Sequence, residues 1–518
     1  MSHVVGAGII HVGDYGEVVD ATNVRGKSRL HNVVFLRVFR SKKCSPRCLW
    51  DESERGRLKF PWSHPMRSSL RLIVAGFHVC LSVIAFVQTV SADGPNWNQF
   101  RGPHGDGTTT ASDLPTTFGE GSPEIVWKTS ISGRAWSSPV VWGKQIWVTN
   151  APEIQNTSKE KPKLETPILL SAVCIDFDTG KMIHDLEIFE LDTPQFTHAT
   201  NSYGSPTPYI EEGRVYIHFG AYGTACVDTK TGRKLWERRD LQCNHFRGSG
   251  SSPLVYGELL YLTFDGYDQQ YIVALDKMIG KTVWKKDRGI DFGTTDGDGK
   301  KAYSTPLVIS MNGRELLISP FAAATIAYDP KTGDPVWTVR HGGANAAGRP
   351  LFGNGLVYIN SADGPNPLIA VSPDGAGDIS KNIVWKTNKS VPKRASQLLL
   401  GERMFMVNDE GVASCLNAIT GQEIWTKRLE GKYWASPLYA DGLMYSFSQT
   451  GVVMVFRAAD EFELVAQNKL DEGLIASPAV AGKSLLLRTK THLYRVEKTD
   501  LASGVDVEIQ PIENVERE

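Results

Sequence analysis

Short apolar runs separated by turn residues recur along most of the chain, from about residue 125 to residue 498. One unit shows the pattern plainly, with apolar runs at Leu254–Tyr256, Leu259–Phe264 and Tyr271–Leu275, and a fourth run beginning at Thr282. Short runs of this kind, bounded by Gly, Asp and Pro, are typical of β-strands. Four of them within about 40 residues predict a small antiparallel sheet. The chain is therefore predicted to be almost entirely β.

A second pattern marks the end of each unit: an Asp or Asn, a Gly four residues later, and a Trp four residues after that. The Gly suits the positive φ of a tight turn, and the Asp or Asn side chain can accept hydrogen bonds from turn amides. The Trp is predicted to pack on the neighbouring unit. The copies are Asp228–Gly232–Trp236, Asp276–Gly280–Trp284, Asp329–Gly333–Trp337, Asn417–Gly421–Trp425 and a degraded Asp176–Gly180–His184. The predicted docking tryptophans are Trp127, Trp236, Trp284, Trp337, Trp385 and Trp425.

The seventh unit lacks this block. Arg457, Glu461 and Val465 fill the three positions that Asp, Gly and Trp fill elsewhere. Without a large aromatic side chain to pack on the next unit, this unit is predicted to have the weakest fastening to its neighbour.

Each unit opens with a small residue, usually followed by Ser-Pro and then by an apolar strand. A repeat of about 40 to 50 residues with four short strands in each copy is typical of a β-propeller. The predicted openings are Ser137-Ser138-Pro139, Gly204-Ser205-Pro206, Ser251-Ser252-Pro253, Ser304-Thr305-Pro306, Gly348-Arg349-Pro350, Ala395-Ser396-Gln397, Ala435-Ser436-Pro437 and Ala476-Ser477-Pro478.

The last unit stops after three strands, near Lys498. The segment Ile125–Lys128 stands before the first opening and carries Trp127 where other units carry their outer-strand Trp. We expect this segment to complete the last unit, because closing the circle removes open sheet edges. The predicted fold is all-β: an eight-bladed β-propeller of four-stranded antiparallel blades over residues 123–500, with the last blade closed by an N-terminal strand.

The pattern Ala-x-Asp-x-x-Thr-Gly-x-x-x-Trp, present at Ala327–Trp337, resembles the tryptophan-docking motif of pyrroloquinoline quinone (PQQ) repeat propellers. The segment WNQFRGP at residues 97–103 is similar to the start of secreted PQQ-like propellers from planctomycete-type bacteria. The resemblance covers about residues 125–498 and implies the quinoprotein alcohol dehydrogenase-like superfamily. That superfamily contains dehydrogenases and also a non-enzymatic lipoprotein that assists outer-membrane protein assembly, so the motif implies the fold rather than an activity.

The resemblance to the dehydrogenases implies an adjacent Cys-Cys disulfide, a Ca²⁺ held by Glu, Asn and Asp, and a further Asp as base. This chain has no Cys-Cys, and the Glu, Asn and Asp set has no residue-by-residue match. The resemblance to the lipoprotein implies a lipidated Cys after the signal, whereas Cys80 lies inside an apolar run. No catalytic or metal-ligating residue is therefore predicted, and PQQ with Ca²⁺ is kept as an alternative cofactor.

Three cysteines, Cys174, Cys226 and Cys415, each stand two residues before the Asp or Asn of a repeat. A free Cys at a repeated strand position behaves as a small apolar core residue. Because the three belong to different units, we expect no disulfide between them.

The 518 residues carry a formal net charge of −1, with 41% hydrophobic and 22% charged residues. This composition allows a packed core. A balanced charge gives no sign of a nucleic-acid partner or of an anionic membrane surface.

The N-terminal part resembles a targeting segment. Arg67 and Arg71 precede the apolar run Leu72–Val90, and the small residues Ser91 and Ala92 follow it. This order is typical of a secretory signal peptide; the alternative is an uncleaved signal anchor, since the run is long enough to span a bilayer. An exported protein, periplasmic or extracellular, is predicted. The expected segments are 1–65 as an over-extended start, 66–92 as the signal, 93–122 as a lead-in and 501–518 as a tail.

The blade openings combine basic and aromatic residues without any Asp or Glu in the six-residue windows that contain them. Loops before the inner strands surround one mouth of a propeller channel, so these side chains are predicted to form a basic, aromatic mouth that suits an anionic, flat or sugar-like ligand. The alternative is that the basic residues occur by chance and the aromatics only cap the core. The candidate residues are Arg134, Trp136, Asn201, Tyr203, His245, Arg247, Lys301, Tyr303, Arg349, Arg394, Lys432 and Trp434.

Two functional classes follow from these patterns. The first is a binding or interaction scaffold whose partner is a protein, a carbohydrate or a small anion at the basic mouth. The second is a PQQ-dependent oxidoreductase acting on an alcohol or a sugar. The sequence favours the first, because the residues that the dehydrogenase resemblance implies are not found.

Overall fold

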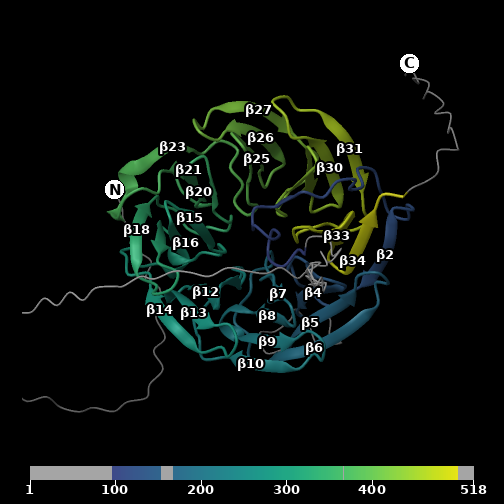
Figure 1. Cartoon of the computed structure of the whole chain (residues 1–518), viewed down its shortest axis with the longest axis horizontal. Helices are drawn as coiled ribbons and strands as arrows, with labels where there is room; N and C mark the ends of the chain where they lie inside the picture. The colour runs from purple at the N-terminus through teal and green to yellow at the C-terminus, as the bar shows by residue number, and fades with distance from the viewer. Residues whose placement is uncertain (1–95, 153–166, 366, 500–518) are drawn as a thin grey trace, which may run out of the picture. The chain divides into compact units, whose positions relative to one another are not determined.

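The computed structural model describes residues 96–152, 167–365 and 367–499. It shows eight sheets arranged in a circle, and in each sheet four antiparallel strands stand side by side in order from the centre of the circle outward (Figure 1). The predicted eight-bladed β-propeller is confirmed, and the described residues contain no α-helix. The predicted signal segment, the upstream region and the C-terminal tail lie outside the described residues.

We number the blades I to VIII in chain order, and each is built from its inner strand outward. Blade I contains β3 (Val140–Trp142), β4 (Gln145–Asn150), β5 (Ile168–Asp176) and β6 (Met182–Leu191), and blade II β7 (Tyr209–Glu211), β8 (Arg214–His218), β9 (Thr224–Asp228) and β10 (Lys234–Arg238). Blade III contains β11 (Leu254–Tyr256), β12 (Leu259–Asp265), β13 (Gln270–Asp276) and β14 (Thr282–Asp287), and blade IV β15 (Leu307–Met311), β16 (Arg314–Pro320), β17 (Ala324–Tyr328) and β18 (Pro335–Arg340).

The second half repeats the arrangement. Blade V contains β19 (Leu351–Gly353), β20 (Leu356–Asn360), β21 (Leu368–Val371) and β23 (Ile383–Thr387), and blade VI β24 (Leu398–Leu400), β25 (Arg403–Val407), β26 (Val412–Asn417) and β27 (Glu423–Arg428). Blade VII contains β28 (Leu438–Ala440), β29 (Leu443–Phe447), β30 (Val452–Arg457) and β31 (Leu464–Lys469). Blade VIII contains β32 (Ala479–Ala481), β33 (Ser484–Arg488), β34 (His492–Glu497) and β2 (Ile125–Ser130). Short additions are β1 (Thr108–Thr109), β22 (Gly377–Asp378) and the 3₁₀ turns η1 (Gly220–Tyr222), η2 (Gly297–Lys300) and η3 (Ser380–Asn382).

The circle closes as the sequence predicts. Strand β2 pairs antiparallel with β34, with Ile125 opposite Val496 and Ser130 opposite His492. Figure 1 shows the blue β2 beside the yellow β34, so the two ends of the propeller meet in one blade. This pairing covers an edge that β34 would otherwise expose.

Tryptophans fasten most of the blades to the blade that follows. The Trp284 ring lies over Gly333 of the next blade, and its Nε1 donates a hydrogen bond to the Pro330 carbonyl at 3.0 Å. Gly333 has φ +72°, and a Cβ there would stand 2.6 Å from the ring, so both the turn and the close approach require glycine. The same arrangement joins Trp127 to Gly180, Trp236 to Gly280 and Trp385 to Gly421.

Two tryptophans depart from this arrangement. Trp425 donates to the Ala459 carbonyl at 2.9 Å, although blade VII has no Asp–Gly turn. Trp337 is buried, and its Nε1 has no hydrogen-bond partner among the described residues. Its neighbour, blade V, joins β21 to β23 through a segment that carries β22 and η3 in place of the Asp–Gly turn. The carbonyl that the other tryptophans use is therefore not presented to Trp337.

The opening of blade II lies two residues later than the sequence pattern predicts. Tyr209 pairs with Tyr216 as Val140 pairs with Trp147, which makes Thr207-Pro208, not Ser205-Pro206, the equivalent of Ser138-Pro139. The segment contains both pairs in succession. A shift of two residues keeps every side chain on the same face of a strand, so the alternation of apolar residues does not distinguish the two registers.

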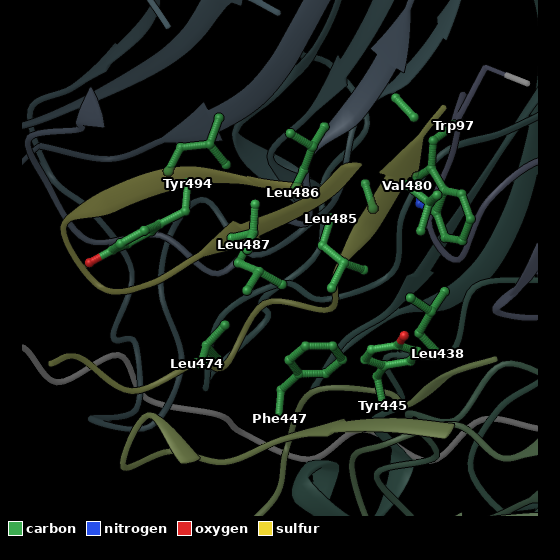
Figure 2. Packing of buried hydrophobic residues seen from close by; sticks show 14 of the residues in the cluster. Trp97, Leu438, Tyr445, Phe447, Leu474, Val480, Leu485, Leu486, Leu487 and Tyr494 are labelled. Atoms are coloured by element: carbon green, nitrogen blue, oxygen red, sulfur yellow. The ribbon is translucent and has the colours of Figure 1, made fainter. Parts of the chain in front are cut away.

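The lead-in begins by crossing one end of the central channel. The Trp97 carbonyl accepts a hydrogen bond from Val141 N of blade I at 2.8 Å, and the Phe100 carbonyl accepts one from Arg349 of blade V at 2.8 Å. Blades I and V stand on opposite sides of the circle, so residues 97–101 span it. Figure 2 shows Trp97 packed against Val480 of blade VIII, with Leu438 of blade VII nearby.

The lead-in then runs along the seam between blades VII and VIII. Strand β1 adds to the inner strand β28 in parallel. The Asn468 side chain accepts from Phe118 N and donates to the Thr116 carbonyl, both at 2.8 Å. Glu120 bonds to Lys469 of blade VII through its backbone and accepts from the Tyr494 hydroxyl of blade VIII. Blade VII lacks the Trp, as predicted, and the lead-in fastens this seam instead.

Replacing Asn468 with alanine is expected to lower the free energy of unfolding by about 1–3 kcal/mol, because two backbone groups of the lead-in lose their partner. The neighbouring Gln467 is exposed, and among the described residues its side chain forms one hydrogen bond, to the surface residue Glu430. Gln467→Ala is the matched control and is expected to change stability by less than about 0.5 kcal/mol. Urea denaturation measures both; equal losses in the two variants would show that the lead-in does not fasten the seam.

The remaining structural predictions concern cysteines and membranes. Cys174, Cys226, Cys243 and Cys415 are buried free thiols in the part of the chain that the structure describes, as expected for core residues. No helix among the described residues has the length and apolar character to cross a lipid bilayer.

Candidate functional site

A circle of hydroxyl groups joins the blades at the channel wall. Each blade opening except one places a Ser or Thr hydroxyl where its oxygen accepts a hydrogen bond from the backbone N–H of the equivalent residue in the preceding blade, at 2.9 to 3.1 Å. We call this set the hydroxyl ring: Ser138, Thr207, Ser252, Thr305, Ser396, Ser436 and Ser477. Blade V supplies Arg349 at this position, so the ring is interrupted between Thr305 and Arg349.

A cavity of about 350 Å³ occupies the central channel next to the hydroxyl ring. All ring members except Ser396 line it, and Phe100 of the lead-in lines it as well. The lead-in bonds to Val141, Ile210 and Tyr439, which lie further along the inner strands than the ring residues. The order along the channel is therefore mouth, hydroxyl ring and lead-in, and the lead-in forms the floor.

Six of the twelve candidate residues from the sequence line this cavity. The aromatic side chains come from three blade openings, and the guanidinium of Arg394 lies 4.2 Å from the centre of the Trp434 ring. Asn201 is held in place by hydrogen bonds from its side-chain amide to the Arg247 and Ser249 carbonyls. The six residues are Trp136, Asn201, Arg247, Tyr303, Arg394 and Trp434.

The other six candidates do not line the cavity. Arg134 donates to the Ala199 carbonyl and lies over the Trp136 ring, and Tyr203 donates to the Gln195 carbonyl. Lys432 is exposed beside Glu410. Three candidates are buried and do not line the cavity: His245, Lys301 and Arg349. Whether a candidate side chain lines the cavity depends on the path of its loop, and the six-residue windows of sequence do not specify that path.

The cations at the mouth are paired with acids from other segments. Arg247 and Lys301 both contact Asp298, which lies in η2, and Lys393 contacts Asp363 at 2.7 Å. Arg394 contacts Asp409, and Lys432 lies 3.6 Å from Glu410. The blade openings hold no acid, but the loops that follow β20 and β25 bring acids to the same mouth. The predicted basic mouth is therefore a mouth of ion pairs.

Three buried arginines have no such partner. Arg349 donates to the Phe100 carbonyl and to Gln99 Oε1, and Arg101 donates to the Asp106 and Gln397 carbonyls. Arg488 donates to the Ser137 carbonyl and hydroxyl, the Thr149 carbonyl and Asn150 Oδ1. Each is at most 2% exposed. Among the described residues, none of the three forms a hydrogen bond or ion pair with a carboxylate. Arg101 and Arg349 bond to the lead-in, and we call these two the floor arginines. Arg488 is not one of them, because it bonds to Ser137, which precedes ring residue Ser138.

All three of these buried arginines keep their positive charge at neutral pH. Burial lowers the pKa of Arg101 to about 9, that of Arg349 to about 10 and that of Arg488 to about 9, all above neutral pH. The Asp106 carboxylate acts on Arg101 and Arg349 through its charge, but its Oδ1 accepts hydrogen bonds from Thr108. By contrast, the buried Arg288 has a carboxylate partner, Asp265, at 2.7 Å. The sequence singled out Arg349 but missed Arg101, which lies in the WNQFRGP segment, and Arg488.

Two further polar segments lie near the mouth. Asp296 accepts a hydrogen bond from Asp298 N at the start of η2, so residues 296–298 form a turn. His198 lines the cavity near Asn201, whereas His245 is buried and accepts a hydrogen bond from Ala221 N. Within residues 96–152, 167–365 and 367–499, no three His, Cys, Asp or Glu side chains gather as a metal site.

Eight four-stranded blades, tryptophan docking and a central cavity define a PQQ-like β-propeller. The family model described as "Outer membrane protein assembly factor BamB" matches residues 171–372 and 370–461, which is more than half of the chain. The chain belongs to this family.

Curated relatives come from both branches of the superfamily. The 1-butanol dehydrogenase (quinone) of Thauera butanivorans is 29% identical over 287 residues, covering 49% of this chain and 41% of that protein. The quinoprotein alcohol dehydrogenase PedH of Pseudomonas putida is 28% identical over 198 residues, covering 36% of this chain and 29% of that protein. The outer membrane protein assembly factor BamB of Burkholderia pseudomallei is 23% identical over 301 residues, covering 54% of this chain and 70% of that protein. The chain thus spans less than half the length of the two quinone-dependent relatives.

Solved structures show the same fold. The quinohemoprotein alcohol dehydrogenase ADHIIG of Pseudomonas putida HK5 superposes with a TM-score of 0.53 at 11% identity, over 78% of this chain and 80% of that chain. A europium-containing methanol dehydrogenase superposes with a TM-score of 0.50 at 11% identity, over 76% of this chain and 89% of that chain.

The cavity does not fit a calcium-bound quinone. Calcium takes about six to eight oxygen ligands, several of them carboxylates. Asp363 is the one carboxylate among the residues that line the cavity, and it already bonds with Lys393 and Asn345. The residues of the cavity therefore provide too few free oxygen ligands for the ion.

Proposed function

We propose that this protein is an exported binding module whose central cavity takes a small ligand of the carbohydrate or small-anion class. The observation that carries the proposal is the aromatic-walled cavity itself, closed below by the lead-in and bordered by side chains that other contacts hold in place. Binding sites for small molecules are concave, with apolar walls and a few well-placed polar groups. Trp136, Tyr303 and Trp434 supply the walls, and the hydroxyl ring and Asn201 supply the polar groups.

Trp434→Ala is expected to abolish ligand binding at the cavity while leaving the fold intact, because the ring forms one wall of the cavity and is exposed to it. The measurement is thermal shift with sugars and small anions; a ligand at 100 times its dissociation constant adds about 2.7 kcal/mol of stability. Tyr256→Ala is the control, because Tyr256 is 38% exposed on blade III and does not line the cavity. A ligand that stabilises the wild type and Trp434→Ala equally binds elsewhere and contradicts the proposal.

A second candidate function is a PQQ-dependent oxidoreductase, and the similarity to the quinone-dependent dehydrogenases supports it. An enzyme of this class reconstituted with PQQ and Ca²⁺ retains the quinone absorbance and reduces a dye in the presence of an alcohol or a sugar. The binding module does neither. The names of the assembly-factor relatives favour a role in protein interaction, so a protein partner is the third outcome to test, by pull-down with the cavity ligand present and absent.

A further inference from the structure

The hydroxyl ring leaves a set of donors directed at the cavity. Each ring oxygen accepts one backbone N–H, and a hydroxyl that accepts can still donate its own hydrogen. No ring hydroxyl donates to an acceptor among the described residues. Six of them line the cavity: Ser138, Thr207, Ser252, Thr305, Ser436 and Ser477. A ligand with several acceptor oxygens around its edge fits such a circle.

The charge around the cavity is distributed unevenly. At the mouth, Arg247, Lys393 and Arg394 each contact an aspartate, so they contribute little net potential. Below the ring, the floor arginines Arg101 and Arg349 have only neutral acceptors in hydrogen-bond range. Arg349 bonds to Phe100, which lines the cavity, and Arg488 bonds to Ser137, which adjoins ring residue Ser138.

Buried charges act over longer distances than exposed ones, because the protein interior screens them weakly. The floor arginines therefore place a positive potential at the lower end of the cavity. The Nε and Nη1 of Arg101 and the Nε of Arg349 are buried and have no hydrogen-bond partner among the described residues. The floor arginines thus favour an anionic ligand through their positive potential, and the hydroxyl ring supplies the hydrogen-bond donors that contact it.

The walls add a second requirement. The aromatic side chains of Trp136, Tyr303 and Trp434 line the cavity, and the guanidinium of Arg394 lies 4.2 Å from the centre of the Trp434 ring. Ring faces pack well against the C–H face of a cyclic ligand. The volume of about 350 Å³ lies near the lower end of the range for small-molecule sites.

We propose that the cavity ligand is an acidic sugar, a monosaccharide with a carboxylate, whose ring lies between the aromatic walls and whose acceptor oxygens face the hydroxyl ring. The inference rests on the proposed function and specifies its ligand. It also moves the source of anion selectivity from the mouth, where the sequence placed it, to the floor arginines.

Isothermal titration at low salt with two matched pairs tests the proposal: D-glucuronate against D-glucose, and D-galacturonate against D-galactose. At least one acid is expected to bind about tenfold more tightly than its neutral parent, the size of a buried unit charge acting at about 10 Å. Inorganic phosphate is the third arm. If phosphate binds as tightly as the sugar acids, the site recognises negative charge alone, and the assignment of a sugar is wrong.

Two variants locate the effect. Thr305→Val keeps the side-chain shape but removes one ring donor and is expected to weaken binding of the acid about tenfold, as for a lost hydrogen bond to a charged group. Ser304→Ala is the matched control: Ser304 is buried and bonds to the Gly348 carbonyl, but it does not line the cavity, so affinity is expected to stay unchanged. Arg349→Gln is expected to reduce the ratio of acid to neutral affinity; if it fails to fold, Thr305→Val and Ser304→Ala decide alone.

The outcomes separate this inference from the proposed function. Equal affinity for acids and neutral sugars, with binding lost in Trp434→Ala, overturns the acidic-sugar assignment and leaves the binding module standing. An unchanged affinity in Thr305→Val overturns the role of the hydroxyl ring. Absence of binding by any acid or neutral sugar overturns the inference. Absence of every ligand at the cavity, in the broader thermal-shift screen as well, overturns the proposed function too.

Discussion

Replacing Trp284 with alanine is expected to lower the free energy of unfolding by about 3–5 kcal/mol, the range for large-to-small changes at buried aromatic residues. The Trp284 side chain is 7% exposed and packs between Tyr261 and Tyr328, with ring centres 5.9 and 6.4 Å away. The substitution also leaves the Pro330 carbonyl without the indole donor. The ring joins blades III and IV, so its loss opens a cavity at a seam. Guanidinium chloride denaturation measures the change.

Val283→Ala provides the matched control for this prediction. Val283 precedes Trp284 in the same strand and is 52% exposed, so its truncation is expected to cost less than about 0.5 kcal/mol. A loss for Trp284→Ala as small as that for Val283→Ala would mean that the docking tryptophans contribute little to the joining of blades.

Acidification is expected to destabilise the protein by about 4 kcal/mol between pH 6.5 and 4.5 through two histidines alone. The contribution of each rises below pH 6.5 toward a limiting slope of about 1.4 kcal/mol per pH unit. Burial lowers the pKa of His245 to about 4 and that of His218 to about 3. In the unfolded chain both titrate near pH 6.5. Below that pH the unfolded chain takes up protons that the native structure excludes, so stability falls as the pH falls. The positive Lys301 reinforces the effect on His245, and Asp268 opposes it.

The variant His245→Gln isolates one of these contributions. It cannot titrate, so the loss of stability between pH 6.5 and 4.5 is expected to shrink by about 2 kcal/mol, whatever its stability at pH 7. His104→Gln is the control, because His104 is exposed in the lead-in. Urea denaturation at four pH values gives the slopes, and the same slope for the wild type and His245→Gln would contradict the buried neutral imidazole.

The blades were predictable from the sequence because the motif that identifies each blade is local. In Asp276–Trp284 the turn amides, the glycine and the tryptophan all lie within nine residues, so the pattern of residue types carries the geometry. The closing strand was predictable for a related reason. The last unit lacked one strand, and a single upstream segment carried a tryptophan in the right place.

The site was predictable only in part, because its important contacts join distant segments. Asp363 and Asp409 neutralise Lys393 and Arg394 from loops outside the openings. Arg349 occupies a ring position but points to the lead-in, which lies about 250 residues earlier in the chain. The serines of the openings were visible as a repeated motif, yet the bond from each to the preceding blade is a property of the closed circle.

The closure of blade VIII has a consequence for how the chain reaches its native state. The contacts that complete the circle join residues far apart in sequence, such as Glu120 and Tyr494, which are separated by 374 residues. Contacts of such long range must overcome a large loss of chain entropy, and they slow folding. During synthesis, β2 emerges among the first described residues but has no partner until β34 follows. Completion of the propeller is therefore a late event that waits for the synthesis of β34, and every earlier intermediate carries at least one unpaired strand edge.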